Sequence, residues 1–373
     1  MSQEITRRQF VKGAASAAVL TVLSGCARHL SGTASAPPAA SDAAPPQLLL
    51  DALHHEDVVI QADAARLLGD LGSRQAVGPL CDYAATSPRY VKTAALDALA
   101  RIGDDRARRT LRPLVDEPRV SDDFWWYGHS SVRTGAVLAL MALGDDSRAK
   151  FLIECEDDHL NWVLFTWFGP TALRLPDRSA TRALKARFTV EELKPDKSDP
   201  GQVIMVCDSL GLLGTEAAHD ALIGLLGHMS RYVRGRAAIN LLGHYGRDAD
   251  VQRVERVAAR DDAMFARVKA AQALAAIGHR RYVEPIAQAV MLADDPFDRA
   301  AALDSLGLVG GNEHVDLIAA QTTDDDAYVR LCAVEALDRI GTDRAVAAAA
   351  ARADDPDLRV QLQAAKTLAA HRA

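Results

Sequence analysis

A glycine that follows an apolar residue recurs along this chain, and its spacing constrains the fold more than any other feature. Successive glycines of this kind are 31, 41, 70, 32, 32, 32 and 31 residues apart. The interval of 70 fits two units, with Leu175-Pro176 in place of the middle pair. A fixed period of about 20–50 residues is typical of repeat proteins. The recurring pairs are Leu71-Gly72, Ile102-Gly103, Leu143-Gly144, Leu213-Gly214, Tyr245-Gly246, Ile277-Gly278, Val309-Gly310 and Ile340-Gly341.

Apolar residues before each glycine follow a helical spacing. In the last complete unit they occupy positions i, i+3, i+4, i+7, i+8 and i+11, which form one face of an α-helix. The glycine then supplies the left-handed residue that ends many helices. A second, looser helical pattern fills the rest of each unit, and pairs such as Asp295-Pro296 are typical helix starts. The apolar positions of that unit are Val329, Cys332, Ala333, Ala336, Leu337 and Ile340.

The sequence therefore predicts an all-α fold, an α-α superhelix of about ten helix-turn-helix repeats over residues 47–373. Paired small residues, such as Ala94-Ala95 and Ala301-Ala302, predict that successive helices approach closely. With packed helices about 8–10 Å apart, such a solenoid is expected to be a rod of roughly 80–100 Å. Two segments break the period: an insertion at residues 117–131, and residues 188–200, which we interpret as a polar surface loop.

The stretch Tyr328–Asp343 carries the repeat most clearly, and Val91–Asp104 and Val132–Asp145 are similar to it. These stretches resemble HEAT-like repeats of the phycobilisome-lyase (PBS lyase) type, and the resemblance covers roughly residues 50–370. It implies an α-solenoid that is a binding scaffold in most members and an enzyme in a minority. It also implies a structural ladder, in which one basic residue of a helix pairs with aspartates of the adjacent turn. Those basic residues are Lys92, Arg133, Arg330 and Arg359.

One enzymatic branch of these repeats can be tested directly on the sequence. Its members, the deoxyhypusine hydroxylase relatives, carry His-Glu pairs ten and nine residues before the terminal glycine, and these pairs bind a di-iron centre. No such pair occupies those positions here, so we exclude that activity. No histidine spacing typical of a helical metal site, nucleotide loop or recognisable catalytic triad occurs either, and we predict no cofactor. In this chain, the positions ten and nine residues before the terminal glycines are occupied by Thr93-Ala94, Thr134-Gly135, Ile204-Met205, Val268-Lys269 and Leu331-Cys332.

Residues 1–25 resemble a bacterial or archaeal signal peptide. Residues 6–12 match the twin-arginine export motif, and the apolar run of 11 residues at 13–23 is too short for a membrane span of about 20. Leu23–Cys26 resembles a lipobox, which implies cleavage before Cys26 and a diacylglycerol on its thiol. We therefore expect export by the twin-arginine machinery and a lipid anchor, with the protein facing the periplasm or the cell exterior. The motif residues are Arg7, Arg8, Phe10 and Lys12.

Residues 26–46 begin with the lipidated cysteine and consist mainly of alanine, serine and proline. Such a stretch does not bury enough apolar surface to fold, so we interpret it as a tether that reaches at most roughly 65 Å. The formal net charge of −7 argues against binding to nucleic acid and against electrostatic attraction to anionic lipid.

The remaining cysteines show no spacing of a zinc or redox motif. The repeat register places them in units that are not neighbours, too far apart for a disulfide. We interpret all four as small buried apolar residues, namely Cys81, Cys155, Cys207 and Cys332.

Aromatic residues concentrate at the first irregularity. All four tryptophans and nine of the 19 aromatic residues lie within residues 124–168, whereas even spreading would place two or three there. Trp167 and Phe168 fall on the buried small-residue pair of the repeat, so we assign them to the core, with Gly169-Pro170 bending their helix. Aromatic residues of the insertion have no such position, and they favour either a partner contact or a hydrophobic lid on neighbouring helices. The predicted contact residues are Phe124, Trp125, Trp126 and Tyr127, with weaker support for His129 and Trp162.

An acidic run lies close to the insertion in sequence. Together with Asp122, Asp123 and His129, it has the donor types of a metal site, but such runs are usually solvated turns and we predict no metal. The run consists of Glu154, Glu156, Asp157, Asp158 and His159.

Three functional hypotheses remain. The favoured one is an exported, membrane-tethered scaffold that mediates protein–protein interaction, with no catalytic residues and an unidentified protein partner. The alternative is a cofactor-handling or lyase-like enzyme with a site near the aromatic insertion, which needs a convergent polar pocket there. The third is a spacer that holds a partner away from the membrane.

Overall fold

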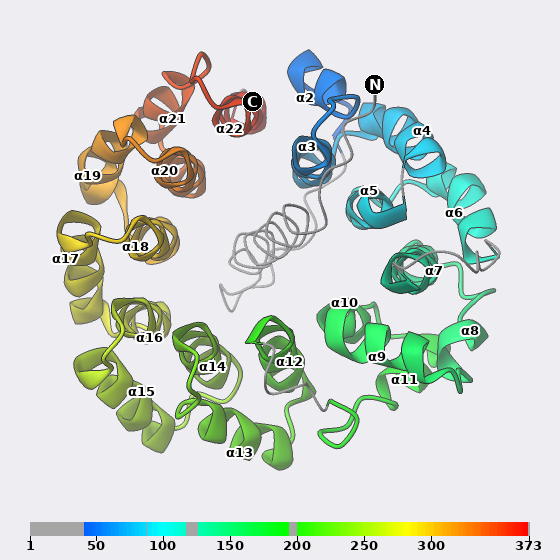
Figure 1. Ribbon diagram of the computed structural model, residues 1–373, viewed down its shortest axis with the longest axis horizontal. Coiled ribbons are helices and arrows are strands. Elements are labelled where there is room, and N and C mark those ends of the chain that lie inside the picture. Colours follow the sequence, from blue (N-terminus) through cyan, green and yellow to red (C-terminus); the bar gives the residue numbers. More distant parts are fainter. Residues whose placement is uncertain (1–40, 88, 117–125, 194–199, 372–373) are drawn as a thin grey trace.

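The protein is a ring of α-helices in two concentric layers (Figure 1). The computed structural model describes residues 41–87, 89–116, 126–193 and 200–371. Outer and inner helices alternate along the chain and run antiparallel, and ten outer–inner pairs follow one another in the described residues. This confirms the predicted all-α superhelix of helix-turn-helix repeats.

The inner helices are α3 (Val58–Leu71), α5 (Arg89–Ile102), α7 (Trp126–Ala142), α9 (Asp158–Trp167) with α10 (Gly169–Leu173), α12 (Pro200–Leu213), α14 (Arg231–His244), α16 (Met264–Ala276), α18 (Pro296–Val309), α20 (Ala327–Ile340) and α22 (Leu358–Ala370). The outer helices are α2 (Gln47–Ala52), α4 (Val77–Thr86), α6 (Arg108–Val115), α8 (Lys150–Ile153), α11 (Ser179–Lys185), α13 (Glu216–Leu225), α15 (Asp248–Arg260), α17 (Val283–Leu292), α19 (Val315–Ala320) and α21 (Asp343–Ala350). Five short 3-10 turns complete the described helical structure.

Local sequence explains where the inner helices begin and end. Aspartates such as Asp57 and Asp326 accept hydrogen bonds from the first-turn N–H groups of α3 and α20. Seven of the eight recurring glycines adopt the predicted left-handed conformation, with φ from 56° at Gly246 to 102° at Gly278. Gly310 does not, because its backbone is extended with φ −75°. Glycine is required there for a different reason: a Cβ would lie 2.4 Å from the Leu306 carbonyl oxygen.

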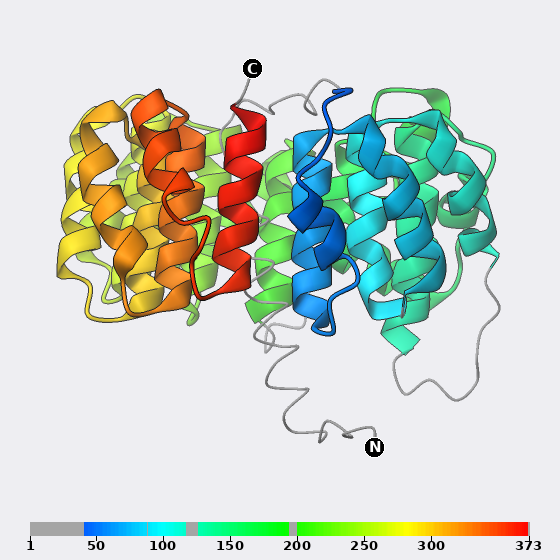
Figure 2. The same cartoon turned by 90° about the horizontal axis from the view of Figure 1, so that it is seen from above.

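The solenoid closes on itself, so the expected rod is wrong. The last inner helix α22 packs against the first, α3, and α2 also contacts α22 (Figures 1 and 2). Across this seam the Nε of Arg359 lies 2.5 Å from a carboxylate oxygen of Asp63. Arg66 of α3 also reaches Glu335 of α20, at 3.6 Å. Small residues allow the curvature, because inner helices come so close that a Cβ on Gly307 would lie 2.6 Å from the Cα of Ala336.

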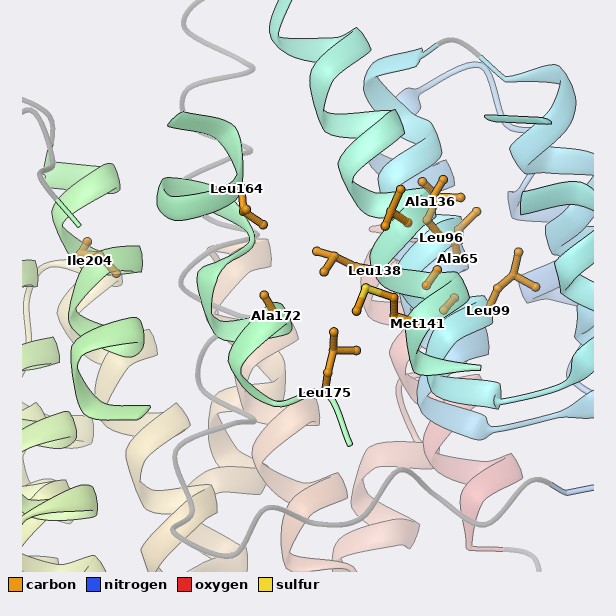
Figure 3. Packing of buried hydrophobic residues seen from close by; sticks show 14 of the residues in the cluster. Ala65, Leu96, Leu99, Ala136, Leu138, Met141, Leu164, Ala172, Leu175 and Ile204 are labelled. Atoms are coloured by element: carbon orange, nitrogen blue, oxygen red, sulfur yellow. The ribbon is translucent and has the colours of Figure 1, made fainter. Parts of the chain in front are cut away.

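Leucine and alanine side chains fill the space between the layers. Between α7 and the α9–α10 pair, Leu138 and Met141 face Leu164 and Leu175 (Figure 3). Phe168 separates α9 from α10 and is half-buried against this core, as its assignment to the core predicted. The helix is interrupted there, as the predicted bend at Gly169-Pro170 anticipated. The side chain of Trp167 lies outside the described part.

Two segments differ from their sequence interpretation. Phe188 and Leu193, at the start of the predicted polar loop, are buried, and the Phe188 ring packs edge-on against Phe165 at 4.9 Å between centroids. Phe188 and Leu193 therefore anchor this half of the loop in the core, whereas Thr189, Glu191 and Glu192 between them are exposed as predicted. Residues 194–199 lie outside the described residues. Ser41, at the end of the predicted tether, is hydrogen-bonded to Gly72 and Arg74 of the first repeat.

The four cysteines among the described residues are free, and two of these four are fully buried. Cys207 and Cys332 are enclosed in the core, whereas Cys81 and Cys155 are half-buried, which corrects the prediction for those two. Burial raises the pKa of the Cys207 and Cys332 thiols, and only a thiolate reacts readily. Iodoacetamide treatment of the native protein, followed by peptide mass spectrometry, should therefore label Cys155 and leave these two unmodified. Rapid native labelling of Cys332 would contradict this packing.

Candidate partner-binding surface

The two rims of the ring have different chemistry. Because outer and inner helices are antiparallel, every outer-to-inner turn lies at one rim and every inner-to-outer turn at the other (Figure 2). We call the first the aspartate rim, after its turns at Asp57, Asp261-Asp262, Asp294-Asp295, Asp324–Asp326 and Asp354–Asp357. The second, the glycine rim, carries the helix stops described above.

Exposed apolar side chains gather at the aspartate rim. Met229, Leu292 and Phe297 are 87%, 69% and 47% exposed, and Met291 beside Leu292 is 61% exposed. All four lie in or beside the turns that lead into α14 and α18. The remaining large exposed apolar residue of the described chain, Ile277, follows α16 at the glycine rim. Because these exposed apolar residues share one rim, we take that rim as the candidate protein-binding surface.

Arginines of the inner helices brace the aspartate rim. Arg234 donates two hydrogen bonds of 2.7 Å to Asp261, and Arg330 donates two of 2.9 Å to Asp355. Although burial opposes it, the bond from Arg330 holds the pKa of the Asp355 carboxyl below its usual range. The predicted ladder is thus present at Arg330.

The other predicted ladder residues make the following contacts in the described part of the chain. Arg133 donates to the Val115 carbonyl and lies 4.3 Å over the Phe151 ring, and Lys92 lies 3.5 Å from the Ala85 carbonyl. Arg359 pairs with Asp63 inside a helix, because the next unit in space is the first repeat. Arg359 is the second residue of α22, whereas Arg330 is the fourth residue of α20, so the contact that closes the ring comes from a different helix position than the ladder.

The predicted contact residues belong to this rim in part. Phe124 and Trp125 lie outside the described residues, and Trp126, Tyr127 and His129 lie on the first turns of α7, where their side chains are not described. Trp162 is half-buried on the neighbouring helix α9. α7 begins 18 residues before the glycine that follows it, whereas α20 begins 14 residues before its own terminal glycine. The backbone of α7 is therefore about 6 Å longer along the helix axis. This extension starts at the aspartate rim.

The far end of α7 is fixed by a carboxylate. Asp145 accepts hydrogen bonds from the Ser147 backbone at 3.1 Å and from Arg112 at 2.9 Å. Bonds from the Ser147 hydroxyl and backbone and from Arg112 lower the pKa of Asp145 to about 2. A carboxyl with a lowered pKa stabilises the folded state above its unfolded pKa and loses this effect as the pH falls.

Asp145→Asn should therefore lower the free energy of unfolding by about 1 kcal/mol at pH 7, with a smaller loss as the pH falls from about 4 toward 2. Urea unfolding at several pH values measures this difference. Asp105→Asn is the control, because the Asp105 side chain is 73% exposed beside Arg108. An Asp145→Asn effect that is the same at every pH would contradict the stated cause.

A shallow pocket that is open to solvent lies between the inner helices α14, α16, α18 and α20. Two aromatic pairs form its walls. Tyr232 and Phe265 meet edge-on at 4.7 Å between ring centroids, and Phe297 and Tyr328 meet at 5.8 Å. Ala300 and Ala301 lie between the two pairs and leave the space open because their side chains are small.

Charged residues form the deep end of this pocket. Lys269 lies 2.5 Å from Asp304, which also accepts a bond of 2.7 Å from Arg339. Burial lowers the pKa of Lys269, whereas the two cations hold the pKa of Asp304 below its usual range against burial. Sequence reasoning did not anticipate this cluster. Its only signal is that Lys269, Asp304 and Glu335 interrupt otherwise apolar helices.

The described residues offer no support for a metal site or a membrane span. No group of three or more His, Cys, Asp or Glu side chains within the described ranges is arranged to hold a metal ion. No helix in this part of the chain is long and apolar enough to cross a membrane. The pocket lies on α14–α20, whereas most of the insertion, where the lyase-like alternative requires one, lies outside the described residues.

Comparison with known families supports the architecture. Residues 46–123 and 283–369 match HEAT repeats, and residues 266–290 match the PBS lyase HEAT-like repeat. The ring contains HEAT repeats. These matches confirm the sequence-based resemblance at the level of the repeat. No curated protein is similar enough to this HEAT-repeat ring to count as a match.

Solved structures align with most of this chain at low similarity. Human deoxyhypusine hydroxylase in complex with glycerol is 18% identical with a TM-score of 0.34, and the alignment covers 87% of this chain and 95% of that one. The complex of CpcE and CpcF of phycocyanin lyase from Nostoc sp. is 20% identical with a TM-score of 0.32, covering 82% and 96%. We assign no activity to this chain on that basis.

Proposed function

We propose that this HEAT-repeat ring is a scaffold that is exported, anchored to the membrane through a lipid on Cys26, and bound to a protein partner at its aspartate rim. The observation that carries the partner site is the clustering of exposed Met229, Met291, Leu292 and Phe297 at one rim. The extension of α7 and its aromatic residues begins at this same rim. A ring also presents a rigid, continuous surface, so a partner is bound with little loss of flexibility.

Crosslinking in intact membranes tests the partner site. A protein recovered with the wild type should be lost with Met291→Ser/Leu292→Ser and weakened with Trp125→Ala/Trp126→Ala. Arg344→Ala, on the exposed face of the outer wall, is the control and should recover the same protein. Identical recovery with all four chains would show that the aspartate rim is not the contact surface.

Export and anchoring are tested separately. Replacing both Arg7 and Arg8 by lysine should leave unprocessed precursor in the cytoplasm, and Cys26→Ser should abolish lipid labelling and membrane retention. Normal processing of the lysine variant would exclude the twin-arginine route. Membrane retention of Cys26→Ser would exclude the lipid as the anchor.

A further inference from the structure

At one place in the aromatic pocket, an arginine of the chain itself lies beside an aromatic ring. Arg231, the first residue of α14, lies 5.0 Å from the centre of the Tyr232 ring and donates to the Tyr232 hydroxyl at 3.0 Å. The same guanidinium reaches across α16 to Asp298 and Asp295 of the α18 start, at 3.3 and 3.4 Å. A guanidinium between an aromatic face and carboxylates is a favourable arrangement, because Arg both stacks and hydrogen-bonds.

The aromatic part of this arrangement recurs without the cation. Phe297 and Tyr328 are the second residues of α18 and α20, as Tyr232 is of α14. The first residues of these helices are Pro296 and Ala327, which carry no charge. Phe297 is 47% exposed, and no cation of the described residues lies over its ring or that of Tyr328.

Exposed carboxylates lie in the turns that precede this pair. Asp294 and Asp325, in the turns just before α18 and α20, are both exposed. The arginines of these turns are already engaged: Arg299 contacts Asp324 at 2.5 Å, and Arg330 contacts Asp355. An arriving cation would therefore find an aromatic face together with exposed negative charge.

We propose that the Phe297–Tyr328 pair binds an arginine side chain from a basic, extended segment of the protein partner, with Asp294 and Asp325 attracting the segment. This assignment rests on the proposed scaffold function and names the chemistry of its partner. Arginine is preferred over an apolar anchor because the chain itself uses Arg231 at the equivalent place of an earlier repeat. The apolar Met291 and Leu292 then contact the rest of the segment.

Fluorescence anisotropy with a labelled arginine–serine repeat octapeptide tests the proposal on the full chain carrying Cys26→Ser. The neutral citrulline–serine isostere is the matched peptide control. Phe297→Leu keeps an apolar side chain but removes the ring face. It should therefore lower the affinity for the arginine peptide about tenfold. Ile277→Ala, at the opposite end of α16 from Phe265, should leave the affinity unchanged. Asp294→Asn/Asp325→Asn should weaken binding and reduce its salt dependence.

Several outcomes overturn the proposal. They are equal affinity for the citrulline peptide, unchanged affinity of Phe297→Leu, or no binding by the full chain. Competition by an unlabelled peptide of residues 1–25 would assign the pocket to the chain's own Arg7 and Arg8. Concentration-dependent dimerisation that Phe297→Leu abolishes would assign it to a second copy. If these peptides fail while membrane crosslinking still depends on Met291 and Leu292, the scaffold function stands and only the arginine site is wrong.

Discussion

Replacing Arg359 by glutamate should open the ring. The native guanidinium lies 2.5 Å from Asp63, and both side chains are largely buried, at 22% and 10% exposure. The substitution places two carboxylates against each other at the only junction that is not continuous in sequence. Breaking a buried pair costs about 3 kcal/mol or more. Small-angle X-ray scattering should show a larger radius of gyration, and the melting temperature should fall.

Two variants make this test specific. Asp63→Arg combined with Arg359→Glu restores opposite charges and should restore the compact ring in part. Arg344→Glu makes the same charge change beside Asp316 on the outer wall, where both side chains are at least half exposed, and should change the free energy of unfolding by less than about 0.5 kcal/mol. An unchanged radius of gyration in Arg359→Glu would mean that apolar contacts alone hold the seam.

Replacing Gly307 by valine should destabilise the protein by about 2–3 kcal/mol or more. A Cβ at this position would lie 2.6 Å from the Cα and 2.8 Å from the Cβ of Ala336, so α18 and α20 must separate. Overpacking of a tight helix contact has this order of cost. Urea unfolding followed by circular dichroism measures the loss.

Gly224→Ala is the matched control for this prediction. Gly224 lies near the end of the outer helix α13, and a Cβ there would meet nothing within 4 Å. Alanine should therefore stabilise the protein by about 0.5–1 kcal/mol, because glycine loses more backbone freedom on folding. A loss of stability in both variants would point to a general effect of the method, whereas tolerance of valine at Gly307 would show that the helix contact can relax.

Local structure was predictable from the sequence because it depends on neighbours along the chain. The apolar positions before Gly341 and the aspartate caps specify each helix without reference to distant residues. Ring closure was not predictable, since Arg359 and Asp63 are almost 300 residues apart and meet only after small rotations accumulate over all repeats. Each close contact, such as Gly307 on Ala336, adds to that curvature. The sequence contains these small residues but not their summed angle.

The candidate site was anticipated only in part. An excess of aromatic residues drew attention to Trp126 and Tyr127, whose helix does extend at the aspartate rim. The pocket between α14 and α20 was not predicted, because its aromatic residues occur once per repeat and form no local cluster in the sequence. These residues are Tyr232, Phe265, Phe297 and Tyr328. Their proximity comes from the stacking of inner helices. A comparison of equivalent helix positions, rather than a search for local clusters, would have found them.

Closure also changes how the molecule comes apart. In an open array, a terminal repeat has one neighbour and frays at low cost, so hydrogen exchange is fastest at the ends. Here α3 and α22 each have a neighbour on both sides, so no repeat can leave until two interfaces have been lost. Detaching the first repeat therefore costs the most free energy, and the repeats that follow unfold more easily. The ring therefore unfolds with a cooperativity that its chain of semi-independent units would not otherwise have.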